Sequence, residues 1–229
     1  MTLRELLKLP ASLDDKPIIA VPLTLGPTDK LTPFARALQE KNPDMVEWRA
    51  DYIADEFSQV MVWQQVKAGA QAELSQKNVS AMTEAKKLAE MDRAQEEFNA
   101  NWPIMNSQII KELAGSVFNT IGSFPIILTY RTKAQGGQGE LSPIEYTTFM
   151  VSALHSGYHF AAVDVEYTLA SELRDKIIAA AHETNTPVIL SYHDFNETRA
   201  VDQFITDMSR TGADIIKLAD RKSTRLNSS

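Results

Sequence analysis

Residues 199–219 read RAVDQFITDMSRTGADIIKLA, and this stretch decides the fold. Residues 199–211 have the spacing of an amphipathic helix, and Gly212 ends it. The apolar run Ala213–Ala219 that follows has the composition of a buried strand. A helix that leads directly into a short apolar strand is the repeating unit of a parallel α/β sheet. Lys217 lies near the carboxyl end of this strand, which is where α/β barrels carry their chemistry.

Lys217 has two interpretations. Burying an unpaired ammonium costs free energy, so a lysine inside a buried strand is often kept for its amine. Burial lowers the pKa of such an amine towards a neutral, nucleophilic form that can attack a carbonyl carbon. The alternative is a lysine on an edge strand whose ammonium lies in water. Taken alone, Lys217 leaves both interpretations open.

Composition narrows the class of protein. The chain has 229 residues, 44% of them hydrophobic, which suits one α/β domain or two small ones. The net charge of −7 disfavours general nucleic-acid or membrane-surface binding. The absence of cysteine excludes disulfides and thiolate metal sites, and the four histidines lack metal-type spacing on one helix face. No signal peptide or long apolar run is evident, so we expect a cytoplasmic protein.

Short β-branched runs alternate with helical patterns along the rest of the chain. This alternation predicts an α/β fold of the (β/α)8 TIM-barrel type, of which about six βα units are present. No Gly-x-Gly-x-x-Gly motif follows the first strand, which disfavours a dinucleotide site. The expected strands are Pro17–Thr24, Asp44–Arg49, Phe124–Arg131, Phe160–Glu166, Pro187–His193 and Ala213–Leu218.

Two stretches interrupt the alternation. Residues 57–118 are far longer than one crossover needs, and much of this segment is rich in Gln, Ala, Glu, Lys and Met. We expect a helical insertion there, in an incomplete barrel of residues 1–219, with an oligomer or lid contact as its role rather than catalysis. Residues 220–229 are polar and basic without periodicity, which predicts a disordered or non-native tail. Without a seventh and an eighth strand, the first and sixth strands are expected to be open edges.

Polar residues stand at the end of each strand from the second onward, where a hydrophobic pattern does not require them. Alternation along a strand places Glu47 and Arg49 on one face of the sheet. In a barrel these strand ends meet at one mouth, where Arg131, His193 and Lys217 join them. A lysine amine can form an iminium with a ketone, and a histidine can move a proton at the adjacent carbon. Two arginines and a carboxylate suit a polyhydroxylated acid.

Each of these residues also has a structural interpretation. An ion pair at the barrel rim is the alternative for Glu47 and Arg49. For His193 taken alone, a satisfied histidine before a turn is the better interpretation. Asp164 and Glu166 share a strand face as well, but we expect them to be structural and to bond within the barrel floor. Cationic neighbours are expected to help keep the lysine amine neutral.

The set of motifs resembles one family, type I 3-dehydroquinate dehydratase. The order and spacing of the motifs fit from about residue 15 to Ala219, apart from the long segment after the second strand. Any one motif is a weak signal, whereas the combination is specific. The motifs are Glu47-Trp48-Arg49-Ala50-Asp51, Thr129-Tyr130-Arg131-Thr132 with Gly136-Gly137, Asp164-Val165-Glu166, Ser191-Tyr192-His193-Asp194-Phe195, and Gly212-Ala213-Asp214 through Lys217-Leu218-Ala219.

The resemblance implies a (β/α)8 barrel, a carbon–oxygen hydro-lyase that dehydrates 3-dehydroquinate to 3-dehydroshikimate in the shikimate pathway of aromatic amino acid biosynthesis. It implies no metal and no organic cofactor. Lys217 would form the Schiff base with the substrate ketone, and His193 would act as general base and then general acid. Glu47, Arg49 and Arg131 would bind the substrate's hydroxyl groups. The family is commonly dimeric and cytoplasmic, so a homodimer is expected.

Two features depart from the family pattern, and two other functions stay open. Gln135 stands where the family usually has a glutamate that supports the catalytic histidine; glutamine can hydrogen-bond an imidazole but cannot stabilise its cation by charge. The expected barrel also lacks the last two strands, as a carboxyl-truncated chain would. The alternatives are another class I Schiff-base barrel enzyme of the aldolase type, and an inactive fragment or non-catalytic interaction protein.

Overall fold

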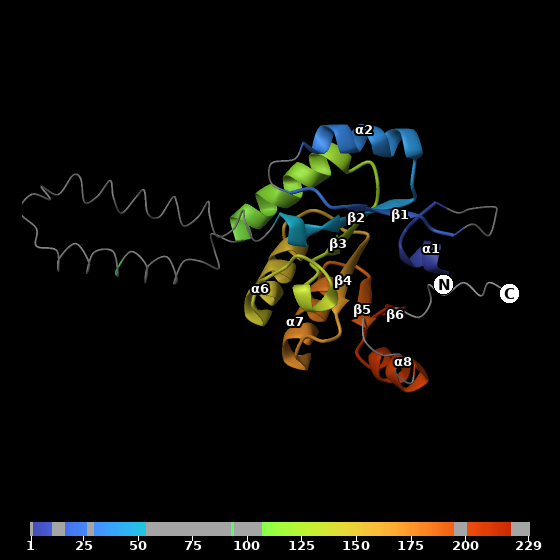
Figure 1. Ribbon diagram of the computed structural model, residues 1–229, viewed down its shortest axis with the longest axis vertical. Coiled ribbons are helices and arrows are strands. Elements are labelled where there is room, and N and C mark those ends of the chain that lie inside the picture. Colours follow the sequence, from blue (N-terminus) through green and yellow to red (C-terminus); the bar gives the residue numbers. More distant parts are fainter. Residues whose placement is uncertain are drawn as a thin grey trace, which may run out of the picture.

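The computed structural model describes residues 2–10, 17–26, 30–53, 93, 107–194 and 201–220. In this part of the chain six parallel strands form one curled sheet, in the order β1-β2-β3-β4-β5-β6 (Figure 1). The predicted barrel-type α/β fold is therefore confirmed, and so is each of its six predicted strands. The strands are β1 Ala20–Leu23, β2 Met45–Arg49, β3 Ile126–Thr129, β4 Ala162–Glu166, β5 Val188–Asp194 and β6 Ile215–Asp220.

Helices connect the strands and cover the outer face of the sheet (Figure 1). A right-handed crossover through a helix is the usual way to bring a chain back parallel to the strand it has just left. Helix α6 begins with a capping box, because the Ser142 hydroxyl accepts from the backbone of Glu145 and the Glu145 carboxylate accepts from the backbone of Ser142. The helices are α1 Leu3–Leu6, α2 Leu31–Lys41, residues 107–121, α6 Pro143–Leu154, α7 Ser171–Glu183 and α8 Val201–Ser209.

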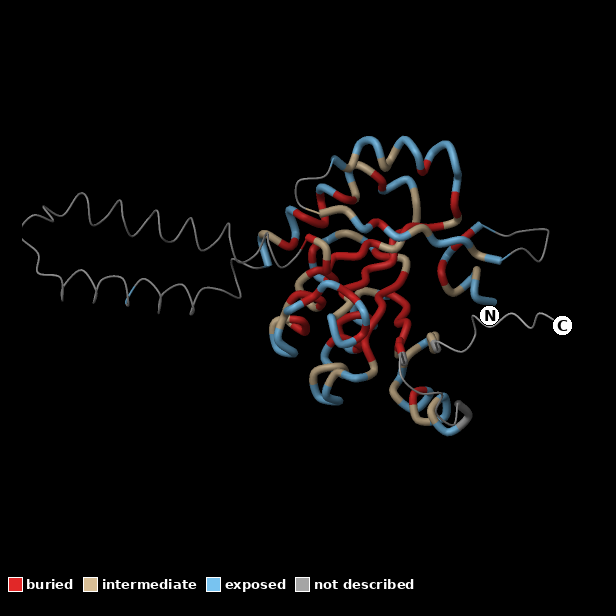
Figure 2. The backbone as a smooth tube through the Cα atoms, in the orientation of Figure 1, coloured by how far each residue is buried: buried red, intermediate tan, exposed pale blue. Residues whose placement is uncertain are grey.

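The main core lies between the sheet and these helices, where Figure 2 shows a buried centre and exposed outer helix faces. Alternate strand residues point into it. Val46 and Trp48 of β2 are fully buried there, and the Trp48 ring stacks on Phe160 with centroids 6.3 Å apart. Trp48 therefore points to the helix layer.

Part of the predicted insertion belongs to this core. Residues 107–121 form the helix that precedes β3, and its side chains Ile110, Val117 and Ile121 are almost fully buried. Residues 107–118 thus supply the crossover helix between β2 and β3. The rest of the predicted insertion, apart from Arg93, and residues 221–229 of the predicted tail lie outside the described residues.

A second, smaller core fills the inner side of the curled sheet near the amino ends of the strands. Residues from β2 to β5 meet there, and the segment around α1 packs against them. We call this cluster the apolar floor. Its buried members are Met45, Ile127, Ala162, Ile189, Leu7 and Leu9, with the partly buried Ile215 of β6 packed against them.

Two aspartates fix the strand register just below this floor. The Asp44 carboxylate accepts from the backbone N–H of Ile19 at 2.9 Å, and this hydrogen bond lowers the pKa of Asp44. The Asp214 carboxylate accepts from Val188 N–H at 2.8 Å in the same way. Arg4 also pairs with Asp44 at 3.0 Å, which ties the amino-terminal segment to β2.

Within the described residues, β1 and β6 each pair with one neighbouring strand, as expected of the two edges. Across the same residues, no helix combines the length and apolarity that crossing a bilayer would require.

Candidate active site

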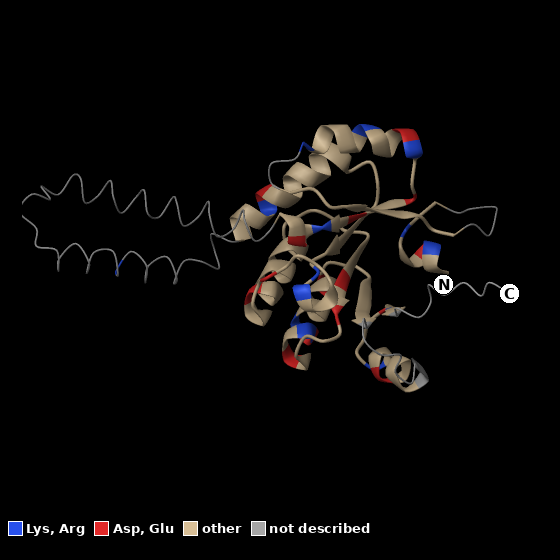
Figure 3. Cartoon of the chain, in the orientation of Figure 1, with Lys and Arg blue, Asp and Glu red and all other residues tan. Residues whose placement is uncertain are grey.

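Above the apolar floor, the inner face of the sheet becomes polar. Two residues further along each strand, the side chain that faces inward can form hydrogen bonds. Figure 3 shows acidic and basic residues near one another in the central part of the sheet. We call this layer the polar belt; it consists of Glu47, Thr129, Asp164, Ser191 and Lys217, one from each of β2 to β6.

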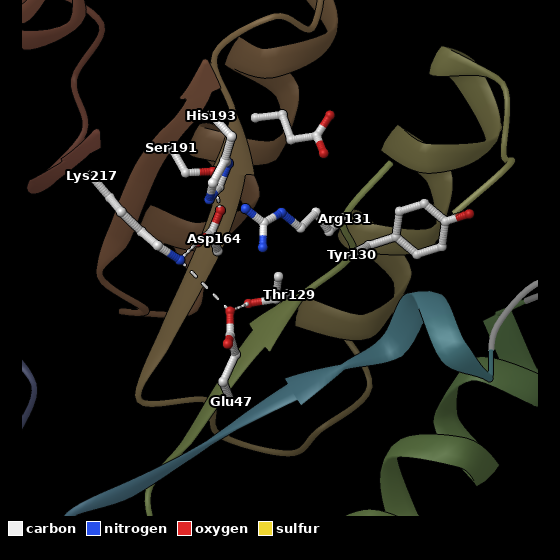
Figure 4. Close-up of a pocket in the computed structure, with 9 residues that line it drawn as sticks. Glu47, Thr129, Tyr130, Arg131, Asp164, Ser191, His193 and Lys217 are labelled. Carbon is white, nitrogen blue, oxygen red and sulfur yellow. Dashed lines mark hydrogen bonds and ion pairs between the residues drawn. The ribbon is translucent and has the colours of Figure 1, made fainter. Parts of the chain in front are cut away.

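The side chains of the polar belt form a continuous chain of contacts (Figure 4). The Thr129 hydroxyl donates to Glu47 Oε1 at 3.0 Å, and Lys217 Nζ lies 3.7 Å from the same oxygen. Lys217 Nζ also donates to Asp164 Oδ2 at 3.0 Å. The other oxygen, Asp164 Oδ1, accepts from the Ser191 hydroxyl at 2.5 Å. Lys217 is therefore connected to β2, β4 and β5 through two carboxylates.

The neighbours of Lys217 differ from the sequence-based expectation. Cationic surroundings were expected to keep its amine neutral, but the two groups in contact with Nζ are the carboxylates of Asp164 and Glu47. The Lys217 side chain is 41% exposed, because β6 has no further strand beside it among the described residues. The structure thus combines both sequence interpretations: an edge-strand lysine whose ammonium nevertheless points into the site.

A third layer continues the same strand faces towards solvent. Arg131, Glu166 and His193 line the pocket together with the polar belt and Tyr130. Arg49 does not line it. Its guanidinium instead makes two hydrogen bonds to Asp51, at 2.8 and 2.6 Å.

His193 is held neutral. Only 7% of the residue is exposed, and burial is the largest cause that lowers its pKa from 6.5 to about 4. The positive charges of Arg131 and Lys217 lower it further. The buried Nδ1 atom has no hydrogen-bond partner among the described residues. A neutral imidazole next to a lysine can accept a proton, which is what a general base must do.

A short loop after β3, residues 132–139, forms a hydrogen bond with the backbone of His193. Gln135 is in the 3-10 helix η4 Lys133–Gln135, and its Oε1 accepts from the His193 N–H at 2.8 Å. The sequence suggested a bond from glutamine to the imidazole, and the structure shows a bond to the backbone instead. Gln135 also accepts, through its carbonyl oxygen, from Arg131 Nε at 2.7 Å. One residue thereby positions two of the predicted site residues.

The same loop is fixed by two buried carboxylates, one from β4 and one from the 3-10 helix that follows β2. Glu166 accepts from Thr132 N–H at 2.7 Å and from its hydroxyl at 2.8 Å, and burial raises the pKa of Glu166. Asp51, in the 3-10 helix η1 Ala50–Tyr52, accepts from Gln138 N–H at 3.0 Å. At Gly137 an added Cβ would overlap the Arg131 carbonyl group. The glycine pair therefore serves a tightly packed turn rather than an open loop.

Four of the five predicted site residues line this one pocket, and Arg49 is the exception. Asp164 and Glu166, which we expected to be structural and to bond within the barrel floor, line the pocket as well, so their placement in the floor is wrong. The structural part of the expectation holds for Glu166, which accepts from Thr132 through both of its oxygens. The expectation missed the contact between Asp164 and Lys217 because it treated these two residues separately. The signal was present in the sequence: Asp164 and Glu166 have the same two-residue alternation as Glu47 and Arg49.

The sheet and the pocket define a barrel-type α/β protein with a lysine, a histidine and paired carboxylates at the carboxyl ends of its strands. Within this class, the chain belongs to the type I 3-dehydroquinase family, whose family model matches residues 77–224.

Individual relatives agree with this family. The 3-dehydroquinate dehydratase of Lactiplantibacillus plantarum is 26% identical over 207 residues, which cover 89% of this chain and 63% of that protein. The protein of the same description from Clostridium kluyveri is 36% identical over 103 residues, 43% of this chain and 40% of the relative. The chain therefore spans less than two thirds of the length of these relatives.

Solved structures agree on the fold. A type I 3-dehydroquinate dehydratase from Clostridium difficile aligns with a TM-score of 0.62 at 22% identity, covering 90% of this chain and 64% of that one. The 3-dehydroquinate dehydratase of Enterococcus faecalis aligns with a TM-score of 0.61 at 21% identity, covering 90% and 67%. At this identity the likeness supports the barrel architecture alone.

Proposed function

We propose that this chain carries the dehydration of 3-dehydroquinate to 3-dehydroshikimate through a Schiff base on Lys217. The observation that supports it most is the meeting of Lys217 and His193 in one pocket, from adjacent strands, beside Glu47 and Arg131. The family membership and the names of the relatives make this reaction the first to test.

The proposed chemistry assigns one task to each of these side chains. The Lys217 amine forms an iminium with the substrate ketone, which acidifies the adjacent carbon. Neutral His193 removes a proton from that carbon and then donates one to the departing hydroxyl. Its lowered pKa keeps it in the accepting form across the neutral pH range.

Substrate binding falls to the residues at the pocket wall. The guanidinium of Arg131 and the carboxylate of Glu47 are suited to hold substrate hydroxyl groups. The Arg49 guanidinium makes its two hydrogen bonds to Asp51 instead. For the proposed contact with substrate, this guanidinium has to extend beyond the Asp51 carboxylate. By analogy with the family, the proposal includes a homodimer, a cytoplasmic location and a reaction without metal or organic cofactor.

Borohydride trapping tests the proposal. The protein is mixed with 3-dehydroquinate and sodium borohydride, and the adduct is located by intact-mass and peptide analysis. We expect a stable adduct on Lys217 in the natural chain and none in Lys217→Met. Lys176→Met, which removes an exposed lysine of α7, serves as the matched control and is expected to trap normally.

A folded natural chain that forms no adduct contradicts the proposed function and favours the non-catalytic alternative. Trapping of other small keto acids in preference to 3-dehydroquinate favours the aldolase-type alternative.

A further inference from the structure

We propose that Asp164 is a further catalytic residue, which takes a proton from the Lys217 ammonium and returns it to the hydroxyl that leaves as water when the imine forms. This inference rests on the proposed function for its substrate, but not for its geometry. That geometry is in the polar belt itself.

Among the described residues, Asp164 is the carboxylate closest to the reacting nitrogen. Its Oδ2 lies 3.0 Å from Lys217 Nζ, within direct hydrogen-bond reach, whereas Glu47 Oε1 lies 3.7 Å away. The Asp164 side chain is only 4% exposed, compared with 22% for Glu47. The Asp164 carboxylate is therefore shielded from bulk water, whereas the Lys217 side chain next to it is 41% exposed.

Ser191 fixes the orientation of this carboxylate. Its hydroxyl donates to Asp164 Oδ1, which leaves Oδ2 directed at Lys217 (Figure 4). The three residues belong to the neighbouring strands β4, β5 and β6, so their spacing is set by the register of the sheet. A carboxylate held at both oxygens by adjacent strands is positioned before any substrate arrives.

The other pocket groups are less suited to this proton transfer. Glu47 is already engaged with the Thr129 hydroxyl. Glu166 accepts from Thr132 through both of its oxygens, so it holds the loop after β3. In the proposed function, His193 is needed at the carbon next to the ketone. Asp164 is the acid in contact with the lysine that has no such task.

With Asp164 as acceptor and then donor, every proton in imine formation is accounted for. The ammonium of Lys217 transfers one proton to the Asp164 carboxylate, and the neutral amine then adds to the carbonyl carbon. A C–N bond forms while the carbonyl oxygen becomes a hydroxyl, using a proton released by the nitrogen. The Asp164 proton then passes to that hydroxyl, which leaves as water as the C=N bond forms. The net change is ammonium plus ketone to iminium plus water, with Asp164 ionised again.

If Asp164 only forms an ion pair with Lys217, its removal is expected to change the rate of imine formation in the opposite direction. If Asp164 only stabilises the ammonium, its removal frees more neutral amine, and Lys217 reacts faster with carbonyl compounds. If Asp164 transfers the proton, its removal slows the reaction. The rate of imine formation therefore separates the two roles.

We would measure that rate in two ways on the full chain. In the first, 3-dehydroquinate is mixed with the protein and quenched with borohydride at timed intervals. In the second, formaldehyde and cyanoborohydride methylate lysines through an imine, and the Lys217 rate is divided by that of Lys176. Asp164→Asn is expected to slow both by on the order of 100-fold, the usual contribution of a positioned acid or base.

Asp214→Asn is the matched control, because it changes an aspartate of similar size near the same strands that supports Val188 rather than Lys217. It is expected to leave both rates unchanged. Equal or faster reaction of Lys217 in Asp164→Asn overturns the proposal. A natural chain in which formaldehyde labels Lys217 but 3-dehydroquinate does not trap overturns the proposed function, while the formaldehyde rates still decide the role of Asp164.

Ser191 is a positioning residue in this scheme. Ser191→Ala is expected to slow imine formation about fivefold, the effect of one lost hydrogen bond, and Ser191→Thr is expected to restore it. A purely structural serine would lower the stability of the fold without changing the rate per folded molecule.

Discussion

The apolar floor and the polar belt occupy the same strands, two residues apart, and differ in almost every physical property. The four floor residues from β2 to β5 are at most 8% exposed and pack in one apolar cluster with Leu7 and Leu9. In the belt, Lys217 is 41% and Glu47 22% exposed, and each side chain has a polar partner. Since residues two apart on a strand share a face, one sheet surface is divided along its length. The amino ends supply folding energy, and the carboxyl ends hold charges where a substrate can reach them.

The largest expected effect tests the floor side of this comparison. Met45 is 1% exposed, so Met45→Ala leaves a cavity that the neighbouring strands cannot fill. We expect a loss of about 2–4 kcal/mol in the free energy of unfolding, measured by urea denaturation. Imine trapping per folded molecule is expected to stay unchanged. The control is Ile144→Ala, at a residue 69% exposed, with an expected change below about 0.5 kcal/mol. Equal losses in the two variants would contradict the assignment of folding energy to the floor.

Much of this division follows from local sequence rules. The six strands, the cap at Ser142 and the inward direction of Glu47 and Lys217 depend on period and on nearest neighbours. Such features are encoded within a few residues of the chain. For the same reason, the sequence predicted four of the pocket residues without a structure.

Contacts between distant strands could not be predicted in this way. Lys217 and Glu47 are on β6 and β2, and they meet only because the sheet curls. Strand alternation assigns a face but does not say which side chains on that face touch. Gln135 illustrates a second limit, because its partner is a backbone N–H that any residue except proline at position 193 would offer.

The second prediction concerns His193, which is buried like a floor residue although it lies at the polar end. Its pKa is about 4 in the folded chain and 6.5 when unperturbed. Between these two pH values the imidazole is therefore protonated in the unfolded chain and neutral in the folded chain. Stability therefore falls as the pH drops from about 6.5 to 4, by on the order of 2 kcal/mol. His193→Gln, which cannot titrate, is expected to lose this part of the pH dependence. Parallel pH profiles for the two chains would show that His193 is not held neutral.

A smaller effect is expected at Gln135, where a charge can be added next to that histidine. Gln135→Glu keeps an acceptor for the His193 N–H but buries a carboxylate at a residue 4% exposed. We expect a loss of about 1 kcal/mol at pH 7 and a rise in the pKa of His193. Titration of the histidine ring signals by NMR would follow that pKa. An unchanged His193 titration would mean that the loop after β3 controls only the backbone position.

The smallest effect is expected where the same loop meets solvent. Lys133 and Glu140 form an ion pair with side chains 59% and 63% exposed, in contrast to the buried Asp51 that also fixes the loop. Water screens an exposed pair, so Glu140→Gln should change the free energy of unfolding by less than about 0.5 kcal/mol. Asp51→Asn, which weakens both the Arg49 pair and the bond from Gln138, should cost clearly more in the same urea titration. A larger loss of unfolding free energy in Glu140→Gln than in Asp51→Asn would mean that the exposed ion pair, and not the buried carboxylates, stabilises the loop. The contrast between buried and exposed charges would then be wrong for this loop.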